Sequence, residues 1–135
     1  MKLKQNRENM LLIHPNYYSI HEKIEAPNVF FDVLEKEKPE VIIHLAAQAG
    51  VRYSIDNPRA YLESNILGTF ELLEVARKFP PKHMLMASTS SVYGANESMP
   101  YREKDKADQQ ISFYAVTKKS NENMAHSYSH LFKLP

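Results

Sequence analysis

Cysteine is absent from the 135 residues, and glycine occurs only three times. Without thiols the chain has no disulfide, no thiolate nucleophile and no cysteine metal site, which fits a protein of the reducing cytoplasm. Histidine does not replace these ligands. Among the six histidines, His126 and His130 share a helical spacing, and we expect both to be solvated helix residues. The sequence therefore predicts no metal centre.

Long apolar runs and an excess of one charge sign are missing as well. No run approaches the roughly 18–20 apolar residues that span a bilayer, and residues 1–7 are basic without the apolar core of a secretory signal. Lysine and arginine number 17 against 16 acidic residues, for a formal net charge of +1. We therefore expect neither a membrane nor a nucleic acid as partner. The apolar content of 43% is enough for the core of one domain.

The N-terminal part has the weakest pattern. Met10–Ile13 and Tyr17–Ile20 are short apolar segments on either side of a turn-like break, and they predict two short strands. Asn28 is expected to cap a helix over residues 29–38, which Pro39 stops.

Two continuous apolar runs follow, Val41–Leu45 and Met84–Ala87. Each predicts a strand, and the first reads as buried on both faces. Between them the apolar positions recur every three or four residues, so we expect a helix from Pro58 to Lys78. Asp56 and Asn57 are its cap candidates.

The last part of the chain predicts a loop and a helix. Residues 97–110 are polar and are expected to form a surface loop, and Ser112 opens a helix that ends near Leu131. Buried strands that alternate with long helices are typical of a parallel sheet with helical crossovers. The predicted fold class is α/β, with a doubly wound parallel sheet.

Tyr114 and Lys118 lie four residues apart in this last helix. The spacing puts both side chains on one face, with Cβ atoms about 5–6 Å apart. A free tyrosine titrates near 10, so a tyrosine base at neutral pH needs a shift of roughly three units, or about 4 kcal/mol. A neighbouring ammonium stabilises the phenolate and supplies part of that shift. The pair is a candidate for proton transfer, and two ordinary helix-surface residues are the alternative interpretation.

Four hydroxyl residues, Ser88 to Ser91, follow the predicted strand Met84–Ala87. Strand ends of this kind line ligand crevices in open α/β sheets. Three stretches, H-L-A-A-Q-A-G-V-R-Y-S, M-L-M-A-S-T-S-S-V-Y-G and F-Y-A-V-T-K-K, together resemble the extended short-chain dehydrogenase/reductase family. The likeness is strongest to its nucleotide-sugar epimerases of the UDP-glucuronate type. It implies a Rossmann-like domain that is incomplete at both ends.

The resemblance implies a catalytic group of Thr89, Tyr114 and Lys118, with NAD as cofactor and a UDP-sugar as substrate. Tyr114 would remove the proton of the sugar 4-hydroxyl while NAD⁺ accepts the C4 hydride. Lys118 would lower the Tyr114 pKa and bind the nicotinamide ribose, and Thr89 would bridge the phenol and the sugar oxygen. Return of the hydride to the opposite face makes the net reaction a 4-epimerisation. For Thr89, a hydrogen bond to the backbone at the strand end is the alternative.

Further contacts follow from the same resemblance. The residues expected to line the NAD site, besides Tyr114 and Lys118, are Leu45, Ala46, Ala47 and Ser64. The residues expected to bind the substrate are Thr89, Ser90, Ser91 and Arg52. Core packing is the alternative for the strand-end residues, a backbone contact for Ser64, and a surface salt bridge for Arg52. A homodimer is also compatible with the resemblance.

Ser90 and Ser91 distinguish between reactions within the family. The related sugar 4,6-dehydratases carry Asp-Glu directly after the threonine, because elimination of water needs an acid and a base beyond the tyrosine. Two serines cannot supply them. The sequence therefore favours an epimerase over a dehydratase, and a dehydratase or reductase of the same family is kept as a second alternative.

The glycines mark a departure from the family. Its members begin with a strand and a G-x-x-G-x-x-G turn that binds the NAD pyrophosphate, whereas Gly50, Gly68 and Gly94 lie beyond that region. Lys23 stands where the family tends to place an adenine-contacting Asp. We expect residues 1–135 to be a partial NAD-binding domain that lacks this turn and the C-terminal substrate part, and to be inactive alone. A non-enzymatic remnant or interaction module is the competing hypothesis.

Overall fold

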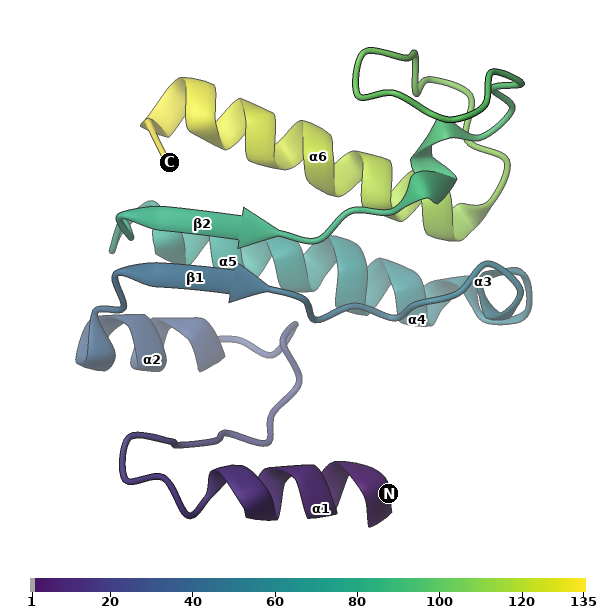
Figure 1. The fold of residues 1–135 in the computed structure, drawn as a ribbon. Helices are drawn as coiled ribbons and strands as arrows, with labels where there is room; N and C mark the ends of the chain where they lie inside the picture. The colour runs from purple at the N-terminus through teal and green to yellow at the C-terminus, as the bar shows by residue number, and fades with distance from the viewer. Residues whose placement is uncertain (1) are drawn as a thin grey trace.

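The computed structural model describes residues 2–135. Its elements are, in chain order, α1 (Lys2–Leu11), α2 (Val29–Glu37), β1 (Val41–His44), α3 (Tyr53–Asp56), α4 (Pro58–Tyr61), η1 (Leu62–Leu67), α5 (Gly68–Ala76), β2 (His83–Met86), η2 (Ser90–Tyr93) and α6 (Phe113–Phe132). The segment η1 is wound as a π-helix and η2 as a 3₁₀-helix. Figure 1 shows their arrangement.

The strands β1 and β2 form a parallel pair, with Val41 opposite His83 and His44 opposite Met86. The run α4–η1–α5 connects them, and it lies where the helix Pro58–Lys78 was predicted. Parallel neighbours need such a crossover, because a tight turn joins only antiparallel strands. The predicted strand pair and its helical connection are therefore confirmed.

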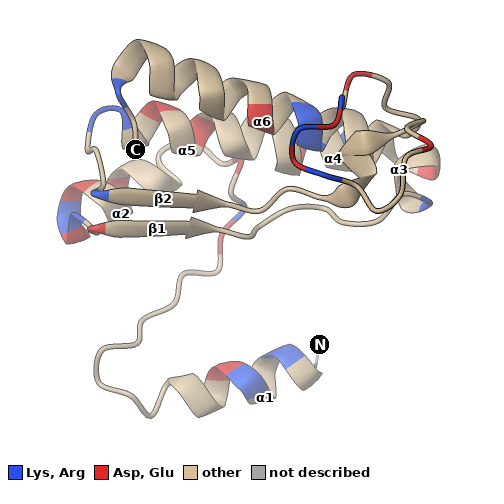
Figure 2. Cartoon of the chain, turned by 45° about the horizontal axis from the view of Figure 1, so that its top comes forward, with Lys and Arg blue, Asp and Glu red and all other residues tan. Residues whose placement is uncertain are grey.

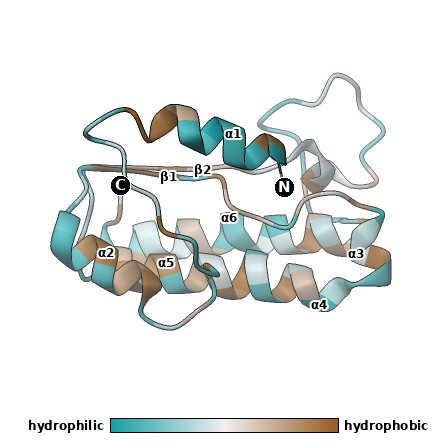
Figure 3. Cartoon of the chain, turned by 90° about the horizontal axis from the view of Figure 1, so that it is seen from below, coloured by the Kyte–Doolittle hydropathy of each residue, from teal (hydrophilic) through white to brown (hydrophobic). Residues whose placement is uncertain are grey.

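The helices lie on two sides of the plane of the sheet (Figures 1 and 3). On one side α2, α5 and α6 lie together, and α1 lies on the other side, displaced beyond β1. Helices on both sides of a parallel sheet define the doubly wound α/β class. The fold is an incomplete Rossmann-like domain, as predicted.

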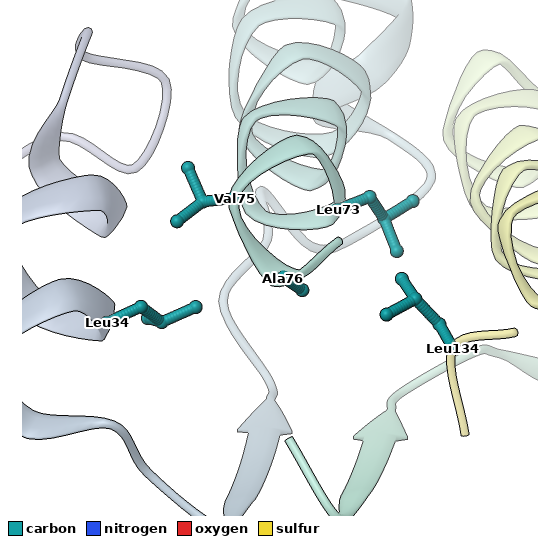
Figure 4. Packing of buried hydrophobic residues seen from close by; sticks show 5 residues of the cluster. All are labelled: Leu34, Leu73, Val75, Ala76 and Leu134. Atoms are coloured by element: carbon teal, nitrogen blue, oxygen red, sulfur yellow. The ribbon is translucent and has the colours of Figure 1, made fainter. Parts of the chain in front are cut away.

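The core lies between the sheet and the helices of one side (Figure 4). Leu34 of α2 packs with Val75 and Ala76 of α5, and Leu134 near the C-terminus packs with Leu73. Each of these side chains is buried. Burial of one leucine contributes roughly 1.5–3 kcal/mol, so this cluster fixes α5 between α2 and the end of α6.

The helix that crosses between the strands begins differently from the prediction. Asp56 ends the short helix α3 instead of capping the next one, and Asn57 makes no side-chain cap. The Asn57 amide donates instead to the Tyr53 hydroxyl at 2.8 Å. Asn28 makes no cap hydrogen bond either, and its φ of 67° is left-handed. Pro58 at the first turn starts α4 without a cap, because its φ is already helical.

The two predicted N-terminal strands are wrong. Lys2–Leu11 is a helix, and Tyr17–Ile20 pairs with no strand among the residues that the structure describes. Lysine, leucine, glutamine, arginine, glutamate and methionine make up most of α1, and all favour helix. A strand needs a partner for its backbone groups, and residues 2–135 offer none beside Tyr17–Ile20.

The burial of β1 on both faces is also wrong for the described residues. Ile42 and His44 face the helices, whereas Val41 is 51% exposed and Ile43 is 60% exposed. Leu85 of β2 is exposed beside them. One face of the sheet therefore carries the core, and the other is open and apolar.

Charged side chains of both signs are spread over the helices and the loop before α6 (Figure 2). Within residues 2–135, no helix combines the length and the apolar character needed to cross a membrane.

Candidate functional site

The first two turns of α6 carry the tyrosine and the lysine singled out above. The Ser112 hydroxyl caps this helix by accepting from the Ala115 N–H at 3.1 Å. Tyr114 and Lys118 follow inside it, one turn apart. The predicted helix and its start at Ser112 are confirmed. The spacing therefore places both side chains on one face of a regular helix.

Tyr114 is held by its backbone and by its ring. Its N–H donates to the Ser54 hydroxyl at 3.2 Å, and its ring meets the Tyr61 ring edge-on, with centroids 5.9 Å apart. Among the residues that the structure describes, the Tyr114 hydroxyl has no hydrogen-bond partner. The phenol oxygen is therefore free to meet a ligand.

Lys118 is buried, with 4% of its surface exposed. Burial lowers the pKa of its ammonium from the ordinary value, and the Glu122 carboxylate opposes this effect. Glu122 is engaged elsewhere, because it accepts hydrogen bonds from Ser88 and Lys119. Within residues 2–135 the Lys118 ammonium forms no ion pair, so its donors are free for an acceptor from outside.

His44 lies at the end of β1 and is 6% exposed. Its Nε2 is 3.1 Å from the Thr69 hydroxyl oxygen. Burial lowers the pKa of this imidazole, and the positive charge of Lys118 lowers it further. Both effects favour the neutral form of His44. No role was predicted for His44 from the sequence.

The hydroxyl cluster follows β2. Thr89 caps η2 by accepting from the Ser91 N–H at 3.3 Å, so the capping role considered as an alternative is present. Ser90 and Ser91 line a groove of about 310 Å³. Its other lining residues are Val51, Gly94, Tyr101, Ile111 and Ser112. The structure therefore brings the two serines beside the start of α6.

Gly94 shapes this groove. Its φ is 56°, and an added Cβ would lie 1.9 Å from the Gln109 carbonyl oxygen. Only glycine allows the loop before α6 to approach so closely. The Ala95 N–H then donates to that same carbonyl at 3.2 Å, which joins the loop to the end of η2.

A second pocket, of about 360 Å³, collects three of the residues predicted to line the cofactor site. Ala46, Ala47 and Ser64 line it together with Lys23 and Glu63. Leu45, by contrast, lines a separate groove along β1 and is 71% exposed.

Arg52 is exposed at the start of α3, and among the described residues it forms no salt bridge. The surface salt bridge considered for it is therefore absent. The structure also does not place Arg52 in the lining of the serine groove, where its neighbour Val51 lies.

Asn65 connects these parts. It is fully buried in the π-helix η1. Its Oδ1 accepts from the Gln48 N–H at 2.7 Å, and its Nδ2 donates to the Gln48 carbonyl at 3.1 Å and to the Thr117 hydroxyl at 2.9 Å. Thr117 donates onward to the Tyr114 carbonyl. One amide therefore fixes the loop after β1 to the turn of α6 between Tyr114 and Lys118.

The family of the chain follows from comparison with known proteins. A family model described as GDP-mannose 4,6-dehydratase matches residues 2–135. The chain belongs to this family. Its members are extended short-chain dehydrogenases/reductases, so the resemblance drawn from the three sequence stretches is confirmed.

Individual relatives are epimerases by name. A probable UDP-glucuronate 4-epimerase of Rhizobium meliloti is 49% identical over 133 residues, which is 98% of this chain and 39% of the relative. UDP-glucuronate 4-epimerase 4 of Arabidopsis thaliana is 51% identical over 94 residues, 69% of this chain and 22% of the relative. The chain thus spans well under half of either protein.

A solved structure shows the same fold. The crystal structure of UDP-glucuronic acid 4-epimerase from Bacillus cereus, in complex with UDP-glucuronic acid and NAD, matches with a TM-score of 0.89 at 32% identity. The match covers 99% of this chain and 41% of that one.

Proposed function

We propose that the chain is the central part of an NAD-dependent nucleotide-sugar 4-epimerase that acts on a UDP-uronate. The observation that carries this proposal is the pair Tyr114 and Lys118 on α6, the helix whose cap residue Ser112 lines a groove together with two serines. The epimerases among its relatives support the same reaction.

The proton transfer is assigned to Tyr114. Its hydroxyl has no partner among the described residues, so it is available to the 4-hydroxyl of a sugar. The ammonium of Lys118 stabilises the phenolate form, because it lies one turn away on the same face. The phenolate takes the proton from the 4-hydroxyl oxygen, and the phenol later returns it.

The residues present fit NAD. Small side chains at Ala46 and Ala47 leave room for a close ligand in their pocket, and Ser64 adds a hydroxyl there. The buried Lys118 ammonium has free donors for the ribose hydroxyls. NAD bound there would supply the hydride acceptor at C4 and return the hydride to either face.

The serine groove is assigned to the sugar. Ser90 and Ser91 supply hydroxyl donors that suit a uronate carboxylate, and neither can act as the extra acid or base that dehydration needs. Thr89, which already caps η2, is assigned to orient the reacting oxygen. This argues for epimerisation although the family model takes its description from a dehydratase.

Turnover of UDP-glucuronate by the full-length protein tests the proposal. With NAD present, NMR spectroscopy of the sugar should show the 4-epimer accumulate without net reduction of the cofactor. The Tyr114→Phe variant should lose at least about 10²-fold in kcat, the usual minimum effect of acid–base catalysis. A variant that kept more than about a tenth of wild-type kcat would rule out the role given to Tyr114. A 4-keto-6-deoxy product instead of the epimer would identify a dehydratase.

A further inference from the structure

Tyr61 is a fully buried residue at the end of α4 that contacts the proposed site at both ends of its side chain. Its hydroxyl donates to the Gly50 carbonyl at 2.6 Å, and the Ala49 carbonyl lies 3.0 Å away. Its ring meets the Tyr114 ring at 71°, with centroids 5.9 Å apart. One side chain therefore joins the loop after β1 to the proposed proton-transfer residue.

Tyr114 depends on packing for its orientation. Among residues 2–135 its hydroxyl has no hydrogen-bond partner, so the phenol cannot be held through its oxygen. The backbone contact to Ser54 fixes the start of the side chain and leaves the ring free to turn. Edge-to-face contact with a fixed ring restricts that rotation, and Tyr61 supplies this contact.

Tyr61 itself is held firmly. On another side its ring packs against the Tyr53 ring, with centroids 6.0 Å apart. Four residues later on the same helical run, Asn65 binds both backbone groups of Gln48. Tyr61 and Asn65 thus anchor one loop at two points, and the loop cannot move without breaking these partly buried hydrogen bonds.

We propose that Tyr61 is a positioning residue that sets the ring of Tyr114 relative to Lys118, an inference that rests on the function proposed above. A displacement of about 1 Å at a reacting atom can cost roughly 10²-fold in rate. The distance between phenol and ammonium also decides how strongly the phenolate is stabilised. Loss of the Tyr61 ring therefore lowers kcat and moves the pH dependence of kcat to higher pH.

The test compares Tyr61→Leu, Tyr61→Met and Tyr61→Phe in the full-length protein. The leucine and methionine variants should lose about 10- to 100-fold in kcat and show an alkaline shift of the pH profile. KM for the sugar nucleotide should change little, because Tyr61 does not line the serine groove. The phenylalanine variant keeps the ring and should stay within about threefold of wild-type kcat.

Tyr128→Leu is the matched control. Tyr128 also packs edge-on against an aromatic ring, that of Phe132 at 5.1 Å, and donates to Glu74 at 2.6 Å, but it lies between α5 and α6 away from the site. This variant should lose stability without a change in kcat or pH profile. A purely structural role of Tyr61 predicts the same behaviour for Tyr61→Leu.

Wild-type kcat and pH profile in a folded Tyr61→Leu or Tyr61→Met variant would overturn the inference. So would a Tyr61→Phe variant as slow as Tyr61→Leu, because the hydroxyl would then be the determinant. If Tyr61→Leu does not fold by circular dichroism, the methionine and phenylalanine variants decide.

If the wild-type protein has no turnover, the proposed function fails by itself. The titration of Tyr114, followed by NMR of ring-labelled tyrosine, then tests positioning directly: an unchanged midpoint in Tyr61→Met refutes it.

Discussion

Polar side chains buried at one end of the sheet determine what the site can do. Among them are His44, Ser54, Asn65, Thr117 and Lys118. Buried polar groups are costly unless each finds a partner, and most of these find one in the backbone or in one another. Two side chains are exceptions among the described residues: the Asn121 Oδ1 is buried without a hydrogen-bond partner, and the Lys118 ammonium forms no ion pair. A buried cation of this kind is a common mark of a functional site.

Lys118 is expected to serve cofactor and base together, which separates it from Tyr114. The substitution Lys118→Met keeps a long unbranched side chain and removes its charge. NAD affinity and kcat should both fall, whereas Tyr114→Phe should lower kcat by about 10² or more and leave NAD affinity nearly unchanged. Calorimetric titration of NAD into the two full-length variants measures the difference. Equal NAD affinities in the two variants would remove the cofactor role from Lys118.

His44 is expected to make stability depend on pH. Because burial, and then the Lys118 charge, lower its pKa, the folded state binds this proton less tightly than the unfolded state. As pH falls below about 6.5, the unfolded chain therefore takes up the proton first. The free energy of unfolding should decline between this pH and the lower pKa of His44 in the folded state. Thermal unfolding between pH 8 and 5 should show the decline, and His44→Gln should reduce it. His126→Gln, at an exposed position of α6, is the control and should behave like wild type.

At the scale of elements, Gly68 controls how closely the N-terminal part approaches the crossover helix. A Cβ at Gly68 would lie 2.6 Å from Cδ1 and 2.7 Å from Cγ1 of Ile24. Helix propensity favours Gly68→Ala by about 1 kcal/mol, whereas overpacking costs roughly 1–3 kcal/mol. The variant should therefore lose up to about 2 kcal/mol in unfolding free energy.

The sign of that effect should reverse once Ile24 is shortened. In an Ile24→Ala background the space is free, so Gly68→Ala should add about 1 kcal/mol through helix propensity alone. Denaturant unfolding of the two single variants and the double variant completes the cycle. Stabilisation by Gly68→Ala in both backgrounds would show that Ile24 does not pack against this helix.

Elements with a strong apolar period could be predicted from the sequence, and those that depend on neighbours could not. The two strands and the crossover helix carry their own pattern, so their pairing followed from the order of elements. Tyr17–Ile20 has the composition of a strand, but no neighbouring strand pairs with it among the described residues. The helix α1 forms because most of its residues favour a helix.

The site divides in the same way. Tyr114, Lys118 and the serines were recognisable as a motif on a helix and at a strand end. Tyr61, Asn65 and His44 were not, because their roles depend on contacts to residues 11 or more positions away in the chain. Spacing within one helix says nothing of which loop or strand a buried side chain will meet.

At the scale of the whole molecule, the two-stranded sheet of the described residues has an unpaired edge and an open apolar face. Val41, Ile43 and Leu85 expose apolar side chains on its open face, and within residues 2–135 β1 pairs on one edge only. An apolar groove of about 300 Å³ runs along β1, lined in part by Phe30 and Leu72. Unpaired strand edges and open apolar faces promote association with other chains.

A polypeptide of these 135 residues should therefore self-associate and bind NAD weakly. The sequence holds no glycine-rich turn to supply backbone N–H groups to a pyrophosphate, so a main source of affinity is missing from these residues. Light scattering should detect oligomers of the purified chain. Calorimetry should show a Kd for NAD well above micromolar, the affinity that corresponds to about −8 kcal/mol.

A charge on the open face tests where the association occurs. Ile43→Lys places an ammonium where the side chain is 60% exposed, and Leu131→Lys does the same at a 63% exposed position of α6. Because a buried unpaired charge is costly, Ile43→Lys should shift the chain towards monomer, and Leu131→Lys should not. Equal effects of the two variants would mean that association does not use this face of the sheet. A stable wild-type monomer with micromolar NAD affinity would show that the chain holds its cofactor without a glycine-rich turn.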